Sequence, residues 1–369
     1  MRKTVVVSAV NIRKGGTLTI LRDCLEHLSG VTGEYRVIAL VHDRKLCEYP
    51  GIEYMEFPWT IRSWGRRLWC EYVTMHRVSK EIAAEDGRKV WMWLSLHDTT
   101  PRVEAEHQEV YCQTSFPFMK ARLRDFLMDP KIPLFTFFTR FAYRINVRRN
   151  DCLIVQQEWF RDAMSRMLGF PKDRIRVIPP KMSRTDIEPA DIRYGVPMFF
   201  FAATADCHKN FETLCEAARL LQERVGEGRF RLVLTISGSE NRYSRWLHRK
   251  WGSVSSIDFH GFMSKPELFG HYKAATAFVF PSRIETWGLP ISEFMAVSDA
   301  PMILADLPYA HESSKGAKDV TYFDINSPAE LAGIMERHIK KSFASSETTL
   351  FKGTSVPAES PFPEGKDLG

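Results

Sequence analysis

The stretch FVFPSRIETWGLPISEF, residues 278–294, carries two acids, Glu285 and Glu293, eight positions apart. It opens with an apolar run that is typical of a buried strand, and Pro281 interrupts that run. Pro290 suits the first turn of a helix, because proline lacks the N–H that a first turn leaves unpaired. The stretch therefore predicts a strand, a loop that contains Glu285, and a helix that contains Glu293 in its first turns.

The same alternation extends outward through the chain, since short apolar runs rich in β-branched or aromatic residues alternate with segments whose apolar residues have helical spacing. The expected strands include residues 4–10, 35–41, 90–96, 150–157, 198–205, 231–238, 256–261, 276–281 and 301–306. The expected helices include residues 17–29, 158–168, 210–225, 244–251, 265–275, 289–297 and 328–343. Such alternation predicts βαβ units and parallel sheets.

A chain of 369 residues is longer than one hydrophobic core usually serves. Residues 181–197 are polar and contain two prolines without a clear period, so we expect a linker there. The prediction is a first α/β domain over residues 1–183, a second over 184–345, and a flexible tail over 346–369. Two such sheets facing each other create a cleft, and ligands bind beyond the carboxyl ends of the strands.

Composition narrows the class of protein. Hydrophobic residues make up 44% and charged residues 26%, which is ordinary for a soluble enzyme. The seven cysteines form no C-x-x-C pair, so reduced thiols in a cytoplasmic protein are expected. Metal ligands are not clustered, and no apolar run reaches the roughly 18 residues that a transmembrane helix needs. We expect neither a metal site nor a membrane span.

Charge is uneven along the chain, because residues 1–185 hold 31 Lys+Arg against 21 Asp+Glu. Eight basic residues interleave with Phe and Leu in residues 116–149: Lys120, Arg122, Arg124, Lys131, Arg140, Arg144, Arg148 and Arg149. This pattern suits a helix at an anionic membrane surface, but it also fits an amphipathic helix that packs on the sheet. No nucleic-acid motif accompanies the charge, so nucleic acid is not an expected partner.

Two turns could receive a phosphate. Gly15 and Gly16 follow the first expected strand and open a helix, and glycine lets backbone N–H groups approach an anion closely. Around Trp287, Gly288 and Leu289, N–H groups at the start of the next helix would point at an incoming anion. A Gly-Gly turn without a ligand, and a Glu293 that merely complements the helix dipole, are the alternatives.

The segment from FHGFMSKPELFG at residue 259 through residue 297, followed by PMILADLPYAHE, resembles the E-x7-E region of retaining GT-B glycosyltransferases of family four. The similarity includes HKNFETLCEAARLL and the Gly-Gly loop, and it spans about residues 4 to 340. The resemblance implies two Rossmann-like domains facing each other across a cleft. It also implies a nucleotide-diphosphate sugar as substrate, without a cofactor or metal.

The resemblance also implies roles for single residues. Glu285 would lie close to the donor sugar, Glu293 would bind the ribose, and Lys209 would hold the diphosphate. Gly15 and Gly16 would let the diphosphate and acceptor approach, and Gly288 and Leu289 would donate backbone N–H groups. Relatives carry an arginine shortly before the lysine, which this chain lacks, so His208 or Arg283 could replace it.

Two further positions concern the acceptor. Many relatives have a histidine where this chain has Gln113, and glutamine can donate to a sugar hydroxyl but cannot take its proton. His97 and Asp98 follow the strand at residues 90–96, and they either contact the acceptor or form a hydrogen-bonded cap. Gln113 and His97 are grouped with Glu285 as candidate catalytic residues, and Arg283 and Trp287 join the donor-binding candidates.

The expected function is transfer of a sugar from a nucleotide-diphosphate donor to a growing, lipid-linked, cell-surface glycan. O-antigen, capsule and exopolysaccharide are such products, and the enzyme would sit in the cytoplasm, peripherally on the inner face of the membrane. A non-catalytic binding subunit with the same fold, and a nucleotide-sugar epimerase, are the alternatives.

Overall fold

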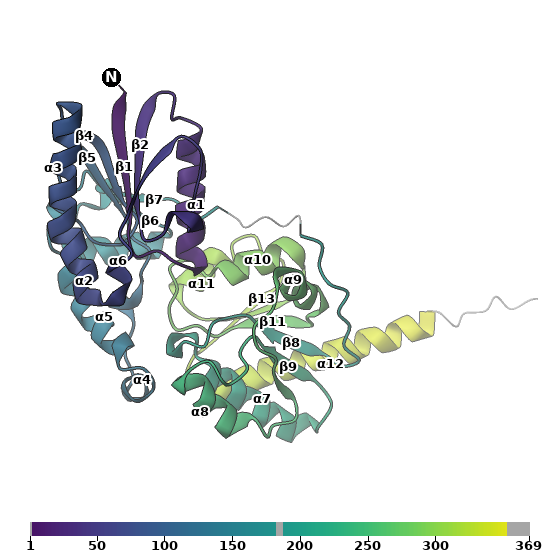
Figure 1. The fold of residues 1–369 in the computed structure, drawn as a ribbon. Coiled ribbons are helices and arrows are strands. Elements are labelled where there is room, and N and C mark those ends of the chain that lie inside the picture. Colours follow the sequence, from purple (N-terminus) through teal and green to yellow (C-terminus); the bar gives the residue numbers. More distant parts are fainter. Residues whose placement is uncertain (1, 182–186, 353–369) are drawn as a thin grey trace, which may run out of the picture.

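A computed structural model describes residues 2–181 and 187–352, with side chains as far as residue 344. The first part of the chain forms a parallel sheet in the order β3-β2-β1-β4-β5-β6-β7 (Figure 1). Its strands are β1 (Lys3–Ala9), β2 (Tyr35–Val41), β3 (Ile52–Glu56), β4 (Val90–Ser95), β5 (Ala105–Tyr111), β6 (Cys152–Val155) and β7 (Ile175–Val177). The helices of this domain are α1 (Gly15–Ser29), α2 (Trp64–Trp69), α3 (Met75–Asp86), α4 (Leu123–Met128), α5 (Lys131–Ala142) and α6 (Glu158–Leu168).

A second parallel sheet follows in the order β10-β9-β8-β11-β12-β13. Its strands are β8 (Met198–Phe201), β9 (Arg231–Leu234), β10 (Ile257–Phe259), β11 (Ala277–Phe280), β12 (Met302–Ala305) and β13 (Val320–Phe323). The helices are α7 (Phe211–Val225), α8 (Arg242–Trp251), α9 (Lys265–Ala274), α10 (Leu289–Val297), α11 (Pro308–Ser313) and α12 (Pro328–Lys352). The two-domain α/β fold predicted from the sequence is confirmed.

The first sheet is covered on both faces, which explains the near-continuous apolar runs of β1, β2 and β6. Neighbouring residues of β1 point to opposite faces, so Val6 joins the core that contains Ile82 of α3, whereas Val7 joins the core under α1. Leu21 and Leu25 of α1 face that second core at helical spacing. Figure 1 shows α1 and α3 on opposite sides of the sheet.

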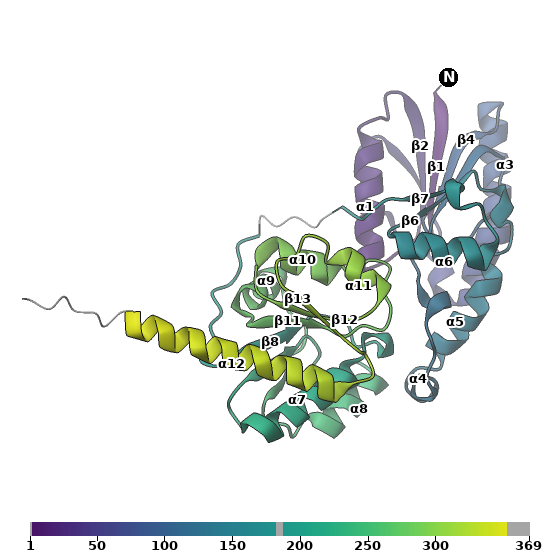
Figure 2. The same cartoon turned by 180° about the vertical axis from the view of Figure 1, so that it is seen from behind.

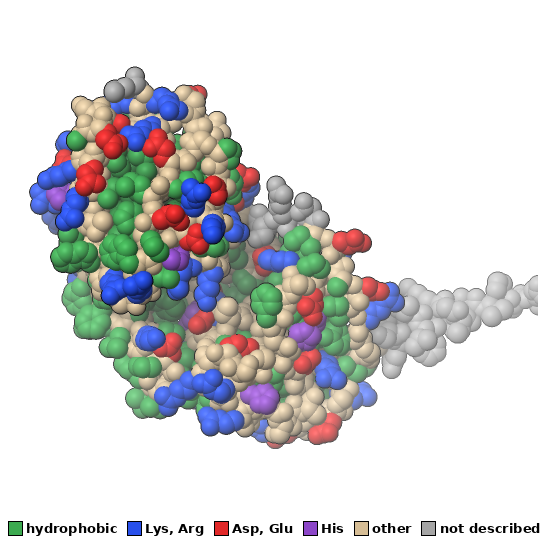
Figure 3. All heavy atoms as spheres, in the orientation of Figure 1, with side chains coloured by type: hydrophobic (Ala, Val, Ile, Leu, Met, Phe, Trp, Pro, Cys, Tyr) green, Lys and Arg blue, Asp and Glu red, His purple; other side chains and the backbone are tan. Residues whose placement is uncertain are grey.

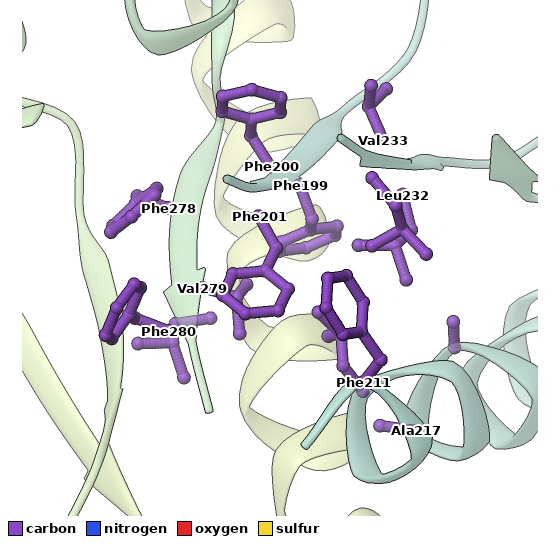
Figure 4. Packing of buried hydrophobic residues seen from close by; sticks show 14 of the residues in the cluster. Phe199, Phe200, Phe201, Phe211, Ala217, Leu232, Val233, Phe278, Val279 and Phe280 are labelled. Atoms are coloured by element: carbon purple, nitrogen blue, oxygen red, sulfur yellow. The ribbon is translucent and has the colours of Figure 1, made fainter. Parts of the chain in front are cut away.

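The second sheet has an aromatic core (Figure 4). Phe201 of β8 packs against Phe211 of α7 with ring centroids 4.6 Å apart. The preceding Phe200 points to the other face and stacks on His271 of α9, at 5.1 Å. The apolar run of β8 is therefore buried on both sides, between α7 and α12 on one face and α9, α10 and α11 on the other (Figures 1 and 2).

The structure differs from the sequence prediction at several elements. The edge strands β3, β7 and β13 and the helices α2, α3 and α11 were not expected. The last helix, α12, continues to Lys352, so residues 346–352 extend a helix where a flexible tail was predicted. The remainder of that predicted tail, residues 353–369, and the predicted boundary between residues 183 and 184 lie outside the described residues. Within the described ranges, none of the helices is both long and apolar enough to cross a membrane.

Candidate active site

Both sheets reverse their winding direction at the centre, and this places the expected site loops together. The chain moves outward from β1 to β2 on one side and from β4 to β5 on the other, and β8 and β11 form the same switch in the second sheet. Ligands of such sheets bind at these switch points, beyond the carboxyl ends of the strands. Gly15 follows β1, Lys209 follows β8 and Glu285 follows β11.

The Gly-Gly loop of the first domain faces the Glu285 loop of the second. A Cβ atom added at Gly16 would lie 3.1 Å from Cδ1 of Leu289, the residue that begins α10. Gly15 has a φ of +70°, a conformation that suits glycine. The two turns expected to receive a phosphate therefore meet across the domain boundary.

Lys209 and Glu285 form an ion pair at this meeting point. The Nζ atom of Lys209 lies 2.5 Å from Oε1 of Glu285, and the two side chains are 13% and 14% exposed. Asn210 ends the lysine turn, and its side-chain amide donates to the backbone carbonyl of Pro281 at the start of the Glu285 loop. A cation and a carboxylate are thus fixed side by side and remain partly accessible.

The turn after Glu285 is held by its own polar atoms. The Trp287 indole N–H donates to the Ser292 hydroxyl at 2.8 Å, and the Ser313 hydroxyl donates to the Trp287 carbonyl. Gly288 has a φ of +85° as the N-cap of α10. The polar atoms of Trp287 therefore shape the turn, while the helix N-terminus at Gly288 and Leu289 faces the first domain.

Glu293 has a partner that the sequence prediction missed. Its Oε1 atom lies 2.5 Å from Nζ of Lys265, the first residue of α9, and Glu293 is only 8% exposed. Lys265 is half-exposed and carries no motif that would have marked it. Each of the two glutamates is therefore paired with a lysine.

The comparison with known families agrees with this geometry. Residues 196–341, which contain both lysine–glutamate pairs, match the family model of glycosyl transferases group 1. This part of the chain therefore resembles the group 1 glycosyltransferases. Proteins of this family transfer sugars from nucleotide-sugar donors.

Solved structures similar to this chain have the GT-B fold. Sucrose-phosphate synthase from Thermosynechococcus elongatus is 14% identical with a TM-score of 0.61, covering 91% of this chain and 89% of that chain. WaaG, a glycosyltransferase involved in lipopolysaccharide biosynthesis, is 13% identical with a TM-score of 0.61 and coverage of 92% and 91%. The lipopolysaccharide outer core galactosyltransferase WaaB is 12% identical with a TM-score of 0.59 and coverage of 92% and 91%. No curated protein sequence matches the chain.

Neither candidate for the missing diphosphate arginine is supported by the structure. Burial, together with the nearby Lys209 and Arg283, lowers the pKa of His208 well below its usual value, so His208 is neutral at pH 7. Arg283 is buried and makes a bidentate ion pair with Asp125, with N–O distances of 2.8 and 2.9 Å. The predicted donor-binding role of Arg283 therefore conflicts with the engagement of its guanidinium elsewhere.

Gln113 lies two residues after β5, and its side chain is oriented by the neighbouring loop. Its amide donates to the Leu96 carbonyl at 2.7 Å, and its backbone N–H donates to Asp98 at 2.6 Å. Among the described residues, Oε1 of Gln113 is buried without a hydrogen-bond partner. Asp98 also accepts from the Thr114 hydroxyl at 2.8 Å, so it has the capping role that was one of its two interpretations.

His97 does not line an open cleft, contrary to the candidate catalytic role. It is 2% exposed and lies in a polar network with Ser8, Thr99 and Glu71, at 2.9, 3.1 and 3.4 Å. Burial lowers the pKa of His97, although the nearby Glu71 carboxylate opposes this effect. The structure therefore supports the alternative of a hydrogen-bonded, structural histidine.

Proposed function

We propose that the protein is a retaining glycosyltransferase that extends a lipid-linked, cell-surface glycan such as O-antigen, capsule or exopolysaccharide. The observation that carries the proposal is the Lys209–Glu285 pair at the meeting point of both switch points. In it, Lys209 binds the donor diphosphate, Glu285 lies beside the sugar and Glu293 binds the ribose. The backbone N–H groups at Gly15, Gly16, Gly288 and Leu289 complete the anion site.

The chemistry follows from the charges of these groups. When the bond between the anomeric carbon and the diphosphate oxygen breaks, the leaving group gains negative charge, which Lys209 and the helix N-termini stabilise. The sugar becomes oxocarbenium-like, and the Glu285 carboxylate stabilises it. The acceptor hydroxyl attacks from the same face and passes its proton to the leaving phosphate oxygen. Gln113 can orient that hydroxyl but cannot take the proton.

A thermal-shift screen of UDP, GDP, dTDP, ADP and CMP tests the donor site. One nucleotide at 100 times its dissociation constant should stabilise the wild type by roughly 2.7 kcal/mol. Glu293→Ala should respond much less, because it loses the carboxylate proposed to bind the ribose. Exposed Glu227, in the turn after α7, provides the matched control Glu227→Ala, which should respond like the wild type. A wild type that responds to none of the nucleotides would contradict the proposal and favour a binding subunit without activity.

The proposal includes a surface by which the enzyme reaches a lipid-linked acceptor. Figure 3 shows hydrophobic and basic side chains along the edge of the first domain where α2, α5 and α4 lie. The exposed large hydrophobic residues here are Trp64, Trp69, Val73, Leu123, Phe126, Leu127, Leu134, Phe137, Phe138, Phe141 and Ile145. We call this set the apolar edge. Exposed basic residues accompany it, namely Arg62, Arg66, Lys120, Arg124, Lys131, Arg140, Arg144 and Arg148.

An apolar surface flanked by lysine and arginine fits an anionic bilayer. We expect the protein to sediment with liposomes that contain anionic lipid at low salt, and less with neutral liposomes. The double variant Phe137→Ser/Phe138→Ser should lose this binding, because both rings are about half exposed at the centre of the apolar edge. Ile178→Ser, at an exposed residue after β7, is the control. Equal sedimentation with either lipid, or none at all, would exclude the membrane surface from the proposal.

A further inference from the structure

Helix α4 belongs to the first domain by sequence but packs against the second. Figures 1 and 2 both show it at the tip of the first domain that lies toward α8. Its Arg124 lies 3.4 Å from the Glu212 carboxylate of α7, and the Arg124 guanidinium lies over the Trp246 ring of α8, at 5.0 Å. The segment therefore reaches across the boundary between the two domains.

The centre of this contact is the ion pair between Asp125 of α4 and Arg283. Both side chains are 3% exposed, and the pair joins residues that are 158 positions apart. Arg283 also donates to the backbone carbonyl of Lys120, at 2.5 Å. The guanidinium thus donates three hydrogen bonds to α4 and the residues just before it.

Arg283 also touches both loops that carry the proposed catalytic pair. It precedes Glu285 by two residues, in the same loop after β11. Its backbone N–H donates to the His208 carbonyl at 2.7 Å, and His208 immediately precedes Lys209. The ring of Phe116, from the first domain, packs edge-on against the His208 ring at 5.0 Å. A movement of α4 would therefore act directly on the Lys209 turn and the Glu285 loop.

We propose that Asp125 and Arg283 are positioning residues that fasten α4 of the first domain to the Lys209 and Glu285 loops, and so hold the cleft in its donor-binding arrangement. The inference rests on the proposed function, because it assigns a role to the surroundings of the same site. Neither side chain touches the substrate. We call the pair the clasp.

The expected kinetic signature follows from this role. Removing one member of a buried ion pair leaves the other charge without a partner, so the clasped arrangement becomes less populated. A donor that binds only this arrangement then has a higher apparent dissociation constant, although saturating donor restores the same reactive complex. Loss of the clasp should therefore raise the donor KM while changing kcat little.

The test compares the wild type with Asp125→Asn. We expect the donor KM to rise about 10-fold or more, kcat to change less than about threefold, and the radius of gyration without ligand to increase in X-ray scattering. Arg124→Ala removes only the peripheral contact with Glu212 and Trp246, so it should give a smaller change in the same direction. It also keeps the inference testable if Asp125→Asn fails to fold. Asp299→Asn breaks an exposed ion pair with Lys318 in the second domain and should change neither quantity.

Each result decides the inference. An unchanged donor KM and scattering curve in Asp125→Asn and Arg124→Ala would overturn it, as would a fall in kcat at constant KM. A wild type that binds no nucleotide would instead refute the proposed function. The scattering comparison is made without ligand, so it would still test the role of the clasp.

Discussion

Replacing Lys209 by methionine is expected to lower kcat/KM for sugar transfer about 10³-fold, or roughly 4 kcal/mol of transition-state stabilisation. Methionine keeps the length and apolar character of the lysine stem but removes the charge proposed to stabilise the departing diphosphate. Neither nearby cation candidate can compensate, because His208 is neutral and Arg283 is bound to Asp125. The variant should also bind nucleoside diphosphates more weakly than the wild type.

Initial rates of transfer, with the nucleotide dissociation constant measured by calorimetry, check this expectation. Lys273→Met provides the control, since Lys273 is exposed on α9 and lies outside the proposed site. Its rates should equal those of the wild type. If Lys209→Met retains more than about a tenth of the activity, Lys209 does not carry the diphosphate charge.

Replacing Glu285 by glutamine should lower kcat about 100-fold, because a neutral amide cannot stabilise an oxocarbenium-like sugar as a carboxylate does. The effect on binding should have the opposite sign to that of Lys209→Met. Glu285 holds the Lys209 ammonium at 2.5 Å, so its loss leaves the full lysine charge for the diphosphate. Nucleoside diphosphates should therefore bind at least as tightly as they do to the wild type.

The two variants together separate charge stabilisation on the leaving group from stabilisation of the sugar. Glu227→Gln is the control for Glu285→Gln. Its kcat and its nucleotide binding should equal those of the wild type. Weaker nucleotide binding by Glu285→Gln would show that Glu285 maintains the loop rather than assisting the reaction. Unchanged kcat would assign no catalytic role to Glu285.

Local patterns predicted the parts of the site that lie within one strand–loop–helix unit. Glu285 and Glu293 were assigned correctly to a loop and a helix, because an apolar run, Pro281 and Pro290 mark the boundaries between them. The strand β8 could be predicted from the sequence, because burial on both faces requires a continuous apolar run. The edge strands β3, β7 and β13 were missed, because each is short or largely half-buried and lacks such a run.

Contacts between distant segments were not predictable in the same way. Asp125 is one of two acids in a basic stretch, but nothing in the sequence specifies that it pairs with Arg283. Lys265 likewise meets Glu293 only because α9 and α10 pack side by side on one face of the second sheet. His97 lies after a strand, as predicted, but its buried network includes Glu71, which comes from the helical segment between α2 and α3, 26 residues earlier.

Helix α4 has six residues, and its two sides face different surroundings. Asp125 faces the second domain, whereas Leu123 is 80% exposed, Phe126 is 48% exposed and Leu127 is 55% exposed on the other side. The choice of assay medium therefore matters for this protein. In plain buffer, these three apolar side chains of α4 are exposed to water while the rates are recorded. Detergent micelles or vesicles would cover the same side chains, so kinetic constants from the two preparations should be compared only within one medium.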